Sequence, residues 1–330
     1  MLHHPFTLRP KPATRSAVRA MSLIVDTDAG VDDLFALALL ASHGADLQLV
    51  TTVHGMSASY KAPAAVRAVL ARVTSGAQCS VVPGAPSWRP GGRSLLSESW
   101  GESVRTLWDE SVPRVLGYDG TACEAGEAGS AEAAAEAMYR AAAAERGAST
   151  LLCLGPLTNV ATAYELYPDL PELFARVISM GGALHADGNT RGNAELNYAL
   201  DPAAADVVLR AHHRSGAAPF LMCDLGTANE RAKDASLAVL GEGRGALGTA
   251  GEIMAGLAWA DGAAACYDPI AAAKCVRESV WAAEPVTVAV DVGTGETTAV
   301  DAGDERGARV LVATEFQVGE YIDLIRRGMR

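Results

Sequence analysis

Short apolar runs that predict strands alternate along this chain with longer segments of helical periodicity. The predicted strands are 23–26, 47–53, 79–82, 150–154, 176–180 and 219–223, and a β-rich tail follows at 286–312. The predicted helices are 32–42, 60–73, 131–146, a helix from about residue 158, and 202–213. Strands separated by helices favour an α/β fold, in which a parallel sheet carries helices on its faces.

The chain reads as one domain of residues 21–330, because no internal repeat and no clear linker interrupts the alternation. Residues 84–128 are rich in Gly, Pro and Ser with few periodic apolar positions, which indicates a long, locally structured insertion. Residues 1–20 carry four arginines and lysines and three prolines but no apolar signal segment. We interpret them as a disordered leader, and Met21 is an alternative start.

Composition excludes several classes of function. A net charge of −12 disfavours nucleic acids and anionic membranes as partners, and no apolar run reaches the length of a membrane span. The six cysteines are scattered without a CxxC pair, which suits neither a zinc site nor a disulfide framework. Reduced thiols in a cytoplasmic protein are the expected state.

The segment IVDTDAGVDD places four aspartates where the first strand meets the first helix: Asp26, Asp28, Asp32 and Asp33. Helix capping accounts for about two of them. Two carboxylates ~5 Å apart repel by roughly 3 kcal/mol at an effective dielectric near 20, so a compensating charge is expected. Carboxylate oxygens are the ligands that hard cations such as Ca²⁺ and Mg²⁺ prefer. An EF-hand does not fit, because its twelfth position holds Leu37 and its glycine is misplaced.

Five segments in order resemble the nucleoside hydrolases of the inosine–uridine-preferring type. They are DTDAGVDDLFAL, VTTVHG, LGPLTNVA (154–161), MGGALHADGNTRGNAELNYALDP (180–202) and YDPIAA (267–272). The resemblance implies that family's fold, a mixed and mainly parallel sheet flanked by helices with a Rossmann-like core. It also implies a homodimer or homotetramer with a small-molecule nucleoside substrate.

The resemblance assigns one Ca²⁺ to the site, with Asp28, Asp33, Asp268 and the backbone carbonyl of Leu154 as ligands. Asp28 is then the expected general base, since it would touch both the metal and the attacking water. Asp32 is expected to hold the 2′- and 3′-hydroxyls, and Asp26 to orient the loop from behind. The other expected substrate contacts are Asn189 and Glu195 at the 5′-hydroxyl, Asn197 at the ring-side hydroxyls, Met180, and Tyr267.

Each of these positions also has a purely structural explanation. Asp268 before Pro269 is a good helix N-cap, Leu154 ends a buried strand, and loop asparagines commonly serve turns. Only the occurrence of all these positions together, in the order of the family's segments, favours a functional interpretation.

Three positions depart from the family's usual pattern. Met56 stands where the family commonly has Asn, and Tyr267 where the inosine–uridine type usually has His. The family's HGxxG segment, which often contributes a histidine to the base pocket, is most like LGYDG (116–120). The sequence therefore does not identify the residue that protonates the departing nucleobase, nor which nucleobase is preferred. His54 follows the second strand and is a candidate for the pocket, as is His185 in the sugar-binding segment.

The expected function is Ca²⁺-dependent hydrolysis of the N-glycosidic bond of a ribonucleoside, giving ribose and a free base. Two alternatives stay open. One is a nucleoside- or ribose-binding homologue without turnover, which the altered base pocket allows and the intact Asp28 opposes. The other is a glycosidase of specialised metabolism that acts on a modified or C-linked nucleoside.

Overall fold

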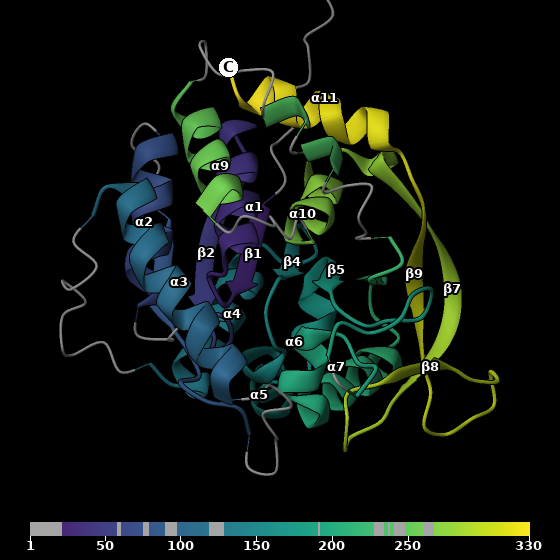
Figure 1. Ribbon diagram of the computed structural model, residues 1–330. Helices are drawn as coiled ribbons and strands as arrows, with labels where there is room; N and C mark the ends of the chain where they lie inside the picture. Colours follow the sequence, from purple (N-terminus) through teal and green to yellow (C-terminus); the bar gives the residue numbers. More distant parts are fainter. Residues whose placement is uncertain are drawn as a thin grey trace, which may run out of the picture.

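The computed structural model of the chain (Figure 1) describes most of the sequence. The described residues are 22–57, 61–74, 79–89, 98–118, 129–190, 192–227, 234–236, 238–240, 248–260 and 267–330. The expected leader and Met21 lie outside this range.

The strands are β1 (Ser22–Thr27), β2 (Asp46–Thr52), β3 (Ser80–Pro83), β4 (Ser149–Cys153), β5 (Phe174–Met180), β6 (Phe220–Cys223), β7 (Trp281–Val290), β8 (Thr297–Ala299) and β9 (Ala308–Phe316). The helices are α1 (Val31–Ser42), α2 (Ala62–Val73), α3 (Glu98–Leu116), α4 (Ala131–Ala144), α5 (Thr158–Leu166), α6 (Leu196–Leu200), α7 (Pro202–Ser215), α9 (Thr249–Ala260), α10 (Asp268–Val276) and α11 (Val318–Gly328). Two 3₁₀ turns, η1 (Leu170–Leu173) and η2 (Glu278–Val280), precede β5 and β7.

The described strands form one nine-stranded sheet in the order β3-β2-β1-β4-β5-β6-β9-β7-β8. All pairs from β3 through to β9 are parallel, whereas β7 pairs antiparallel with both β9 and β8. The mixed, mainly parallel sheet expected from the sequence is confirmed. Chain order runs outward from β1 to β3 in one direction and from β4 to β6 in the other, so the order reverses between β1 and β4.

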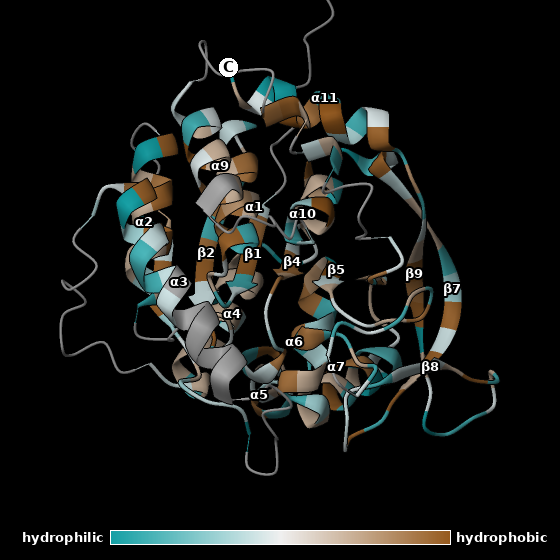
Figure 2. Cartoon of the chain, in the orientation of Figure 1, coloured by the Kyte–Doolittle hydropathy of each residue, from teal (hydrophilic) through white to brown (hydrophobic). Residues whose placement is uncertain are grey.

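Helices cover both faces of this sheet and enclose two apolar clusters. One cluster joins α1, α2, α3, α9, α10 and α11 to the sheet, and the other joins α4, α5 and α7. Helix α1 is buried from Asp33 to Ala41 without a polar face, because neighbouring helices α2, α9 and α10 pack around it. Figure 2 shows the contrast with α2 and α11, which carry both hydrophilic and hydrophobic residues as surface helices do.

Helix α3 corrects the interpretation of residues 84–128. This segment does contain periodic apolar positions, since Trp108, Val112 and Leu116 follow one another at a spacing of four and are all buried. Pro113 inside the helix and the surrounding polar residues hid that stripe, because proline normally ends a helix. The C-terminal helix α11 and the start of β7 at Trp281, five residues before the expected β tail, were also missed.

Helix α10 is tied to β7 by a buried lysine. The Lys274 side chain, 5% exposed, donates to the backbone carbonyls of Glu278 and Trp281, the latter at 2.7 Å, and its Nζ lies 4.6 Å from the centre of the Trp281 ring. The Trp281 indole in turn donates to the carbonyl of Ile270 at 3.1 Å. These contacts fix the helix whose first residue is Asp268.

We expect Lys274→Met to lower the free energy of unfolding by about 3 kcal/mol, because two carbonyls lose a charged donor in the protein interior. Lys61→Met is the matched control, since Lys61 pairs with Asp109 at 2.6 Å on the surface. That change is expected to cost less than about 1 kcal/mol. Urea denaturation of the two variants makes the comparison, and equal losses would contradict the structural role of Lys274.

Candidate active site

The candidate site lies where the strand order reverses. Ligands of open α/β sheets bind outside the carboxyl ends of the strands at such a switch point. Here β1 and β4 are neighbours, with Asp26 opposite Cys153, and the Leu154 amide donates to the Asp26 carbonyl at 2.8 Å. The aspartate-rich turn after β1 therefore lies beside Leu154, although 126 residues separate Asp28 from it in the sequence.

The turn between β1 and α1 is held by its own side chains. The Ala29 amide donates to Thr27 Oγ1 at 3.0 Å, and the same hydroxyl donates to the Asp33 carboxylate. No side chain caps α1, whose N-cap position is Gly30. Capping thus does not explain the aspartates: Asp32 and Asp33 sit inside the first helical turn, while Asp28 lies before it.

Asp28 is held rigidly in the interior and is 1% exposed. One carboxylate oxygen accepts the Met56 amide at 2.8 Å and the other accepts the Gly30 amide at 3.2 Å. Gly55 permits this packing, because a Cβ at that position would lie 1.9 Å from Asp28 Oδ2. The VTTVHG segment thus shapes the site through a missing side chain, and Met56 contributes its backbone amide to Asp28.

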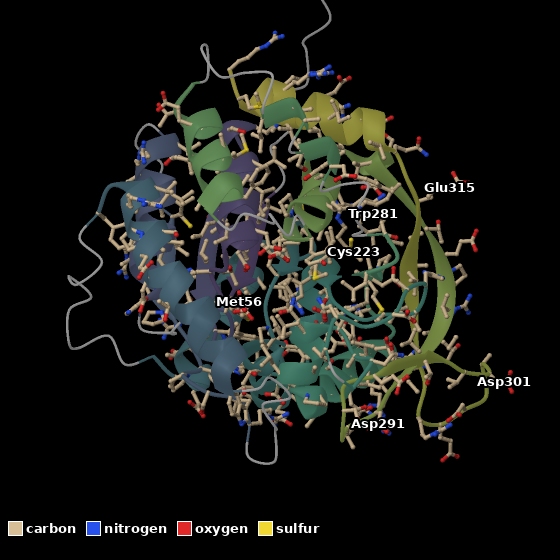
Figure 3. The ribbon with its side chains drawn as sticks, viewed as in Figure 1. Met56, Cys223, Trp281, Asp291, Asp301 and Glu315 are labelled. Carbon is tan, nitrogen blue, oxygen red and sulfur yellow. The ribbon has the colours of Figure 1, made fainter. Side chains whose placement is uncertain are left out.

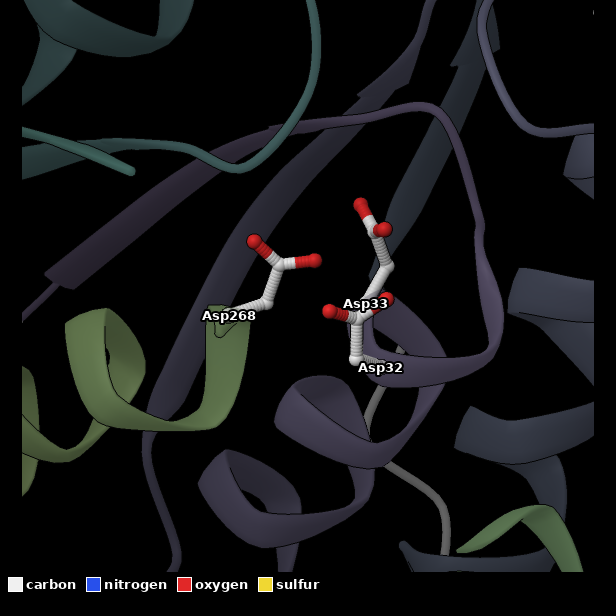
Figure 4. A group of neighbouring side chains, drawn as sticks. All are labelled: Asp32, Asp33 and Asp268. Carbon is white, nitrogen blue, oxygen red and sulfur yellow. The ribbon is translucent and has the colours of Figure 1, made fainter. Parts of the chain in front are cut away.

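Three further carboxylates gather beside Asp28. Oxygens of Asp32, Asp33 and Asp268 lie within 4.8 Å of one another, where the first turns of α1 and α10 face each other (Figure 4). Asp33 is the centre of the group, since its charge is among the causes that raise the pKa values of both Asp28 and Asp268. Asp33 and Asp268 are 2% and 3% exposed.

Burial and mutual repulsion make this cluster hold protons. Burial first, and then the charge of Asp32, raises the pKa of Asp33 to about 6. Burial and the neighbouring carboxylates raise the pKa values of Asp28 and Asp268 well above their usual range. A divalent cation bound by oxygen ligands offsets the same repulsion, so the donor set fits Ca²⁺ or Mg²⁺ chemistry.

The segment after β5 reaches the same edge of the sheet. Asn197 Nδ2 donates to the carbonyls of Leu154 at 2.9 Å and Met180 at 3.3 Å, and it lies 3.5 Å from Met180 Sδ. Glu195 accepts the amides of Gly182, Asn197 and Tyr198 at 2.8–3.2 Å. Burial raises the pKa of Glu195 to about 7. The structure therefore brings Met180, Glu195 and Asn197 to Leu154, as their expected shared role requires.

Asn189 and Tyr267 stand at the edge of this arrangement. Asn189 is exposed and its side-chain oxygen accepts the Leu196 amide at 2.9 Å, so it also organises the turn before α6. Tyr267 is half-buried at the N-cap of α10, directly before Asp268, and packs on the large apolar cluster. The expectation that Asp268 itself is the N-cap is off by one position.

His54 belongs to a different network. Its Nε2 lies 3.0 Å from Thr158 Oγ1, which donates to Asp201 at 2.7 Å, and its ring meets Trp88 edge-on at 5.5 Å. Burial lowers the pKa of His54 to about 4, so the ring is neutral at pH 7. Neither Thr158 nor Trp88 belongs to the carboxylate cluster, and the structure does not bring the His54 side chain into it. His185, half exposed, lies 3.3 Å from buried Asp224.

Two contacts at the site carried no signal in the local sequence. The Trp108 indole, from α3, donates to the Ala29 carbonyl at 2.7 Å. Asn159 Nδ2 donates at 2.8 Å to the same oxygen of Asp26 that accepts Thr51 Oγ1 at 2.6 Å. Asn159 lies inside the LGPLTNVA segment that carries the resemblance, but the sequence does not indicate its contact with Asp26.

Comparisons with known proteins show the family of this chain. A sequence profile described as "Inosine-uridine preferring nucleoside hydrolase" matches residues 23–323. The chain belongs to this nucleoside hydrolase family.

The pyrimidine-specific ribonucleoside hydrolase RihA of Klebsiella pneumoniae is 31% identical over 194 residues, and the match covers 58% of this chain and 58% of that relative. The inosine-uridine preferring nucleoside hydrolase of Bacillus anthracis has a similar fold, with a TM-score of 0.71, 20% identity and coverage of 94% of this chain and 99% of that one. A purine-preferring ribonucleoside hydrolase of Gardnerella vaginalis also has a similar fold, with a TM-score of 0.69 and 21% identity. The match covers 93% of this chain and 98% of that one.

The protein in the presence of a metal chelator is expected to lose stability as pH rises from about 4 to about 7. Burial raises the pKa of Asp26 from 3.8 to about 7, so between these values the folded state binds more protons than the unfolded state. Asp26→Asn removes this titration, and its free energy of unfolding should fall less over the same range.

Urea denaturation of chelated protein at pH 5 and pH 8 measures the effect. Asp301→Asn, on the exposed β8–β9 connection (Figure 3), is the control and should follow the parent. Parallel pH dependences of the parent and Asp26→Asn would show that Asp26 is not the group responsible.

Proposed function

We propose that this protein hydrolyses the N-glycosidic bond of a ribonucleoside with the help of bound Ca²⁺, releasing ribose and a free base. The observation that carries the proposal is the buried carboxylate cluster at the β1–β4 switch point, with Asp28 held beside Leu154 and Asn197. Family membership supports the reaction class. The names of the relatives include pyrimidine-specific and purine-preferring enzymes, so the proposal stops at a ribonucleoside.

Asp28, Asp33, Asp268 and the Leu154 carbonyl would hold the cation. When bound, it supplies positive charge that offsets the carboxylate repulsion and favours ionisation of water at the site. The Leu154 carbonyl accepts Asn197 Nδ2, so the same asparagine ties this ligand position to the sugar-binding segment.

Asp28 is the proposed general base. Its two oxygens are fixed by the amides of Met56 and Gly30, so a water proton would meet an acceptor in one defined orientation. Asp32, which is half-buried, would accept the 2′- and 3′-hydroxyls. Donation of those hydroxyls to a carboxylate strengthens as the sugar ring gains positive charge.

The remaining substrate contacts follow the positions of Asn189, Glu195, Asn197 and Tyr267. Glu195 and Asn197 line the sugar side through the Leu154 network. Tyr267 offers an aromatic face for the departing base, and a tyrosine with a pKa near 10 is a poor proton donor at neutral pH. We therefore propose stacking on the base, and not acid catalysis, as the role of Tyr267.

We further propose a homodimer or homotetramer in the cytoplasm. The four described cysteines, Cys79, Cys153, Cys223 and Cys275, are free, which suits a reducing compartment. Within the described residues, none of the helices has the length and hydropathy to span a bilayer.

Asp28→Asn should lower kcat/KM for the best nucleoside by at least ~10²-fold, because it removes the proton acceptor. The measurement is free-base release from a panel of purine, pyrimidine and modified nucleosides, with calorimetry of the same panel. Asp301→Asn is the surface control. Binding without base release by the parent would instead support the non-catalytic alternative, and near-parent turnover by Asp28→Asn would place water activation elsewhere.

Chelation should lower both activity and the melting temperature, and Ca²⁺ should restore them. Binding to the native state alone adds RT ln(1 + [L]/Kd), about 2.7 kcal/mol at a hundredfold excess over Kd. Asp268→Asn should shrink the Ca²⁺-dependent shift in melting temperature, whereas Asp301→Asn should keep it. A melting temperature that ignores both chelator and Ca²⁺ in the parent would exclude the metal site.

A further inference from the structure

The turn that carries Asp28 contains a strained alanine. Ala29 has a φ of 55°, in the left-handed region that residues with a Cβ rarely adopt, and it is fully buried. Among the described non-glycine residues only Ala29 and Asn193 have a positive φ. Such a conformation persists only where surrounding contacts hold it, so the contacts of Ala29 decide whether the turn keeps its shape.

Two hydrogen bonds hold Ala29, one on each side of its Cα. The amide donates to Thr27 Oγ1, two residues away in the same turn. The carbonyl accepts the Trp108 indole at 2.7 Å, from a helix 79 residues further along the chain. The Thr27 contact is local and moves with the turn. On the amide side, Ser57 Oγ donates to the Asp28 carbonyl, so the peptide before Ala29 is anchored independently of α3. On the carbonyl side, the Trp108 contact ties Ala29 to a separate part of the fold.

Helix α3 is a firm support for that contact. Trp108 is 3% exposed and packs in the same apolar cluster as α1, α2 and α9. The next residue, Asp109, pairs with Lys61 at 2.6 Å, and Arg72 of α2 donates to the Val115 carbonyl at 2.8 Å. The indole N–H is therefore presented from a helix that is docked at several points.

We propose that Trp108 is a positioning residue for the carboxylate cluster. By holding the Ala29 carbonyl, it keeps the turn left-handed, and the left-handed turn keeps Asp28 against the Met56 amide and within reach of Asp33. A right-handed Ala29 would redirect the chain between Asp28 and the first turn of α1. The consequence for Ca²⁺ and turnover rests on the proposed function, whereas the geometry of the turn does not.

Through Trp108, helix α3 is connected to the turn that carries Asp28. Coupling between two sites is reciprocal, so a cation that requires the left-handed turn must also favour the docked position of Trp108. Helix α3 lies in the insertion 84–128, which is distinct in sequence from the segments that carry the family resemblance. The insertion thus contributes to the shape of the metal-binding turn through one hydrogen bond.

Trp108→Phe tests this, because phenylalanine keeps an aromatic ring and removes the N–H. Ala29→Gly is the second variant, since glycine adopts a positive φ at little cost and needs no external support. In chelated protein, we expect amide exchange at Ala29 and Gly30 to be about tenfold faster in Trp108→Phe than in the parent. Adding Ala29→Gly should bring the rate at Gly30 back to within about threefold of the parent.

Calcium titration by calorimetry gives the matching readout. Trp108→Phe should raise the Kd for Ca²⁺ about tenfold, and the same change in the Ala29→Gly background should raise it less than about threefold. Trp281→Phe is the matched control, because it removes an indole donor from the Ile270 carbonyl in the core. Its effects should be the same with alanine or glycine at position 29.

A purely structural Trp108 would give a different pattern. Trp108→Phe would then melt earlier while loop exchange and Kd stayed within twofold of the parent, or its losses would persist unchanged beside Ala29→Gly; either result overturns the proposal. Should Trp108→Phe fail to fold, site-specific benzothienylalanine, which replaces the N–H by sulfur at nearly the same ring size, gives the same test. A parent protein that binds no Ca²⁺ would refute the proposed metal, and the exchange rates of the chelated variants would still decide the role of Trp108.

Discussion

Repulsion among buried carboxylates is the constraint around which this molecule is organised. Asp28, Asp33 and Asp268 are nearly inaccessible to water, which would otherwise screen their charges. Burial and mutual repulsion raise the pKa values of all three carboxyl groups, so without a cation the cluster holds protons more readily than exposed aspartates do. Repulsion among these carboxylates opposes folding. The same negative charges attract a divalent cation, so the site favours cation binding.

The architecture contributes to the tolerance of that charge. Asp32 and Asp33 lie in the first turn of α1 and Asp268 begins α10, so the amino ends of two helices face the cluster. The partial positive charge of helix amino ends stabilises carboxylates there. Lys274 and Trp281 anchor the far end of α10, and Trp108 of α3 holds the turn before α1. The cluster is therefore supported from outside the residues that compose it.

Hydrogen bonds to Asn197 organise the proposed sugar side of the site. Its side chain donates to the Leu154 carbonyl, which would face the cation, and its backbone amide donates to the Glu195 carboxylate. Small displacements of the segment after β5 are thus transmitted to a proposed metal ligand. This arrangement gives a physical reason for the spacing of Asn189 and Glu195 before Asn197, because both side chains accept backbone amides at the start of α6.

The sequence by itself determined the α/β class, the parallel strands and the aspartate-rich turn, because apolar alternation and charge crowding are local properties. The resemblance of five segments to a known family also implied which distant residues meet, and the structure brings Leu154, Met180, Glu195 and Asn197 together. Only the tertiary structure decided that α3 supplies Trp108 to Ala29, since its apolar stripe is interrupted by Pro113. It also decided that the His54 side chain lies against Thr158 and Trp88, since these contacts join residues that are far apart in the sequence. Such contacts depend on how helices dock on the two faces of the sheet, and local sequence periodicity carries no record of that docking.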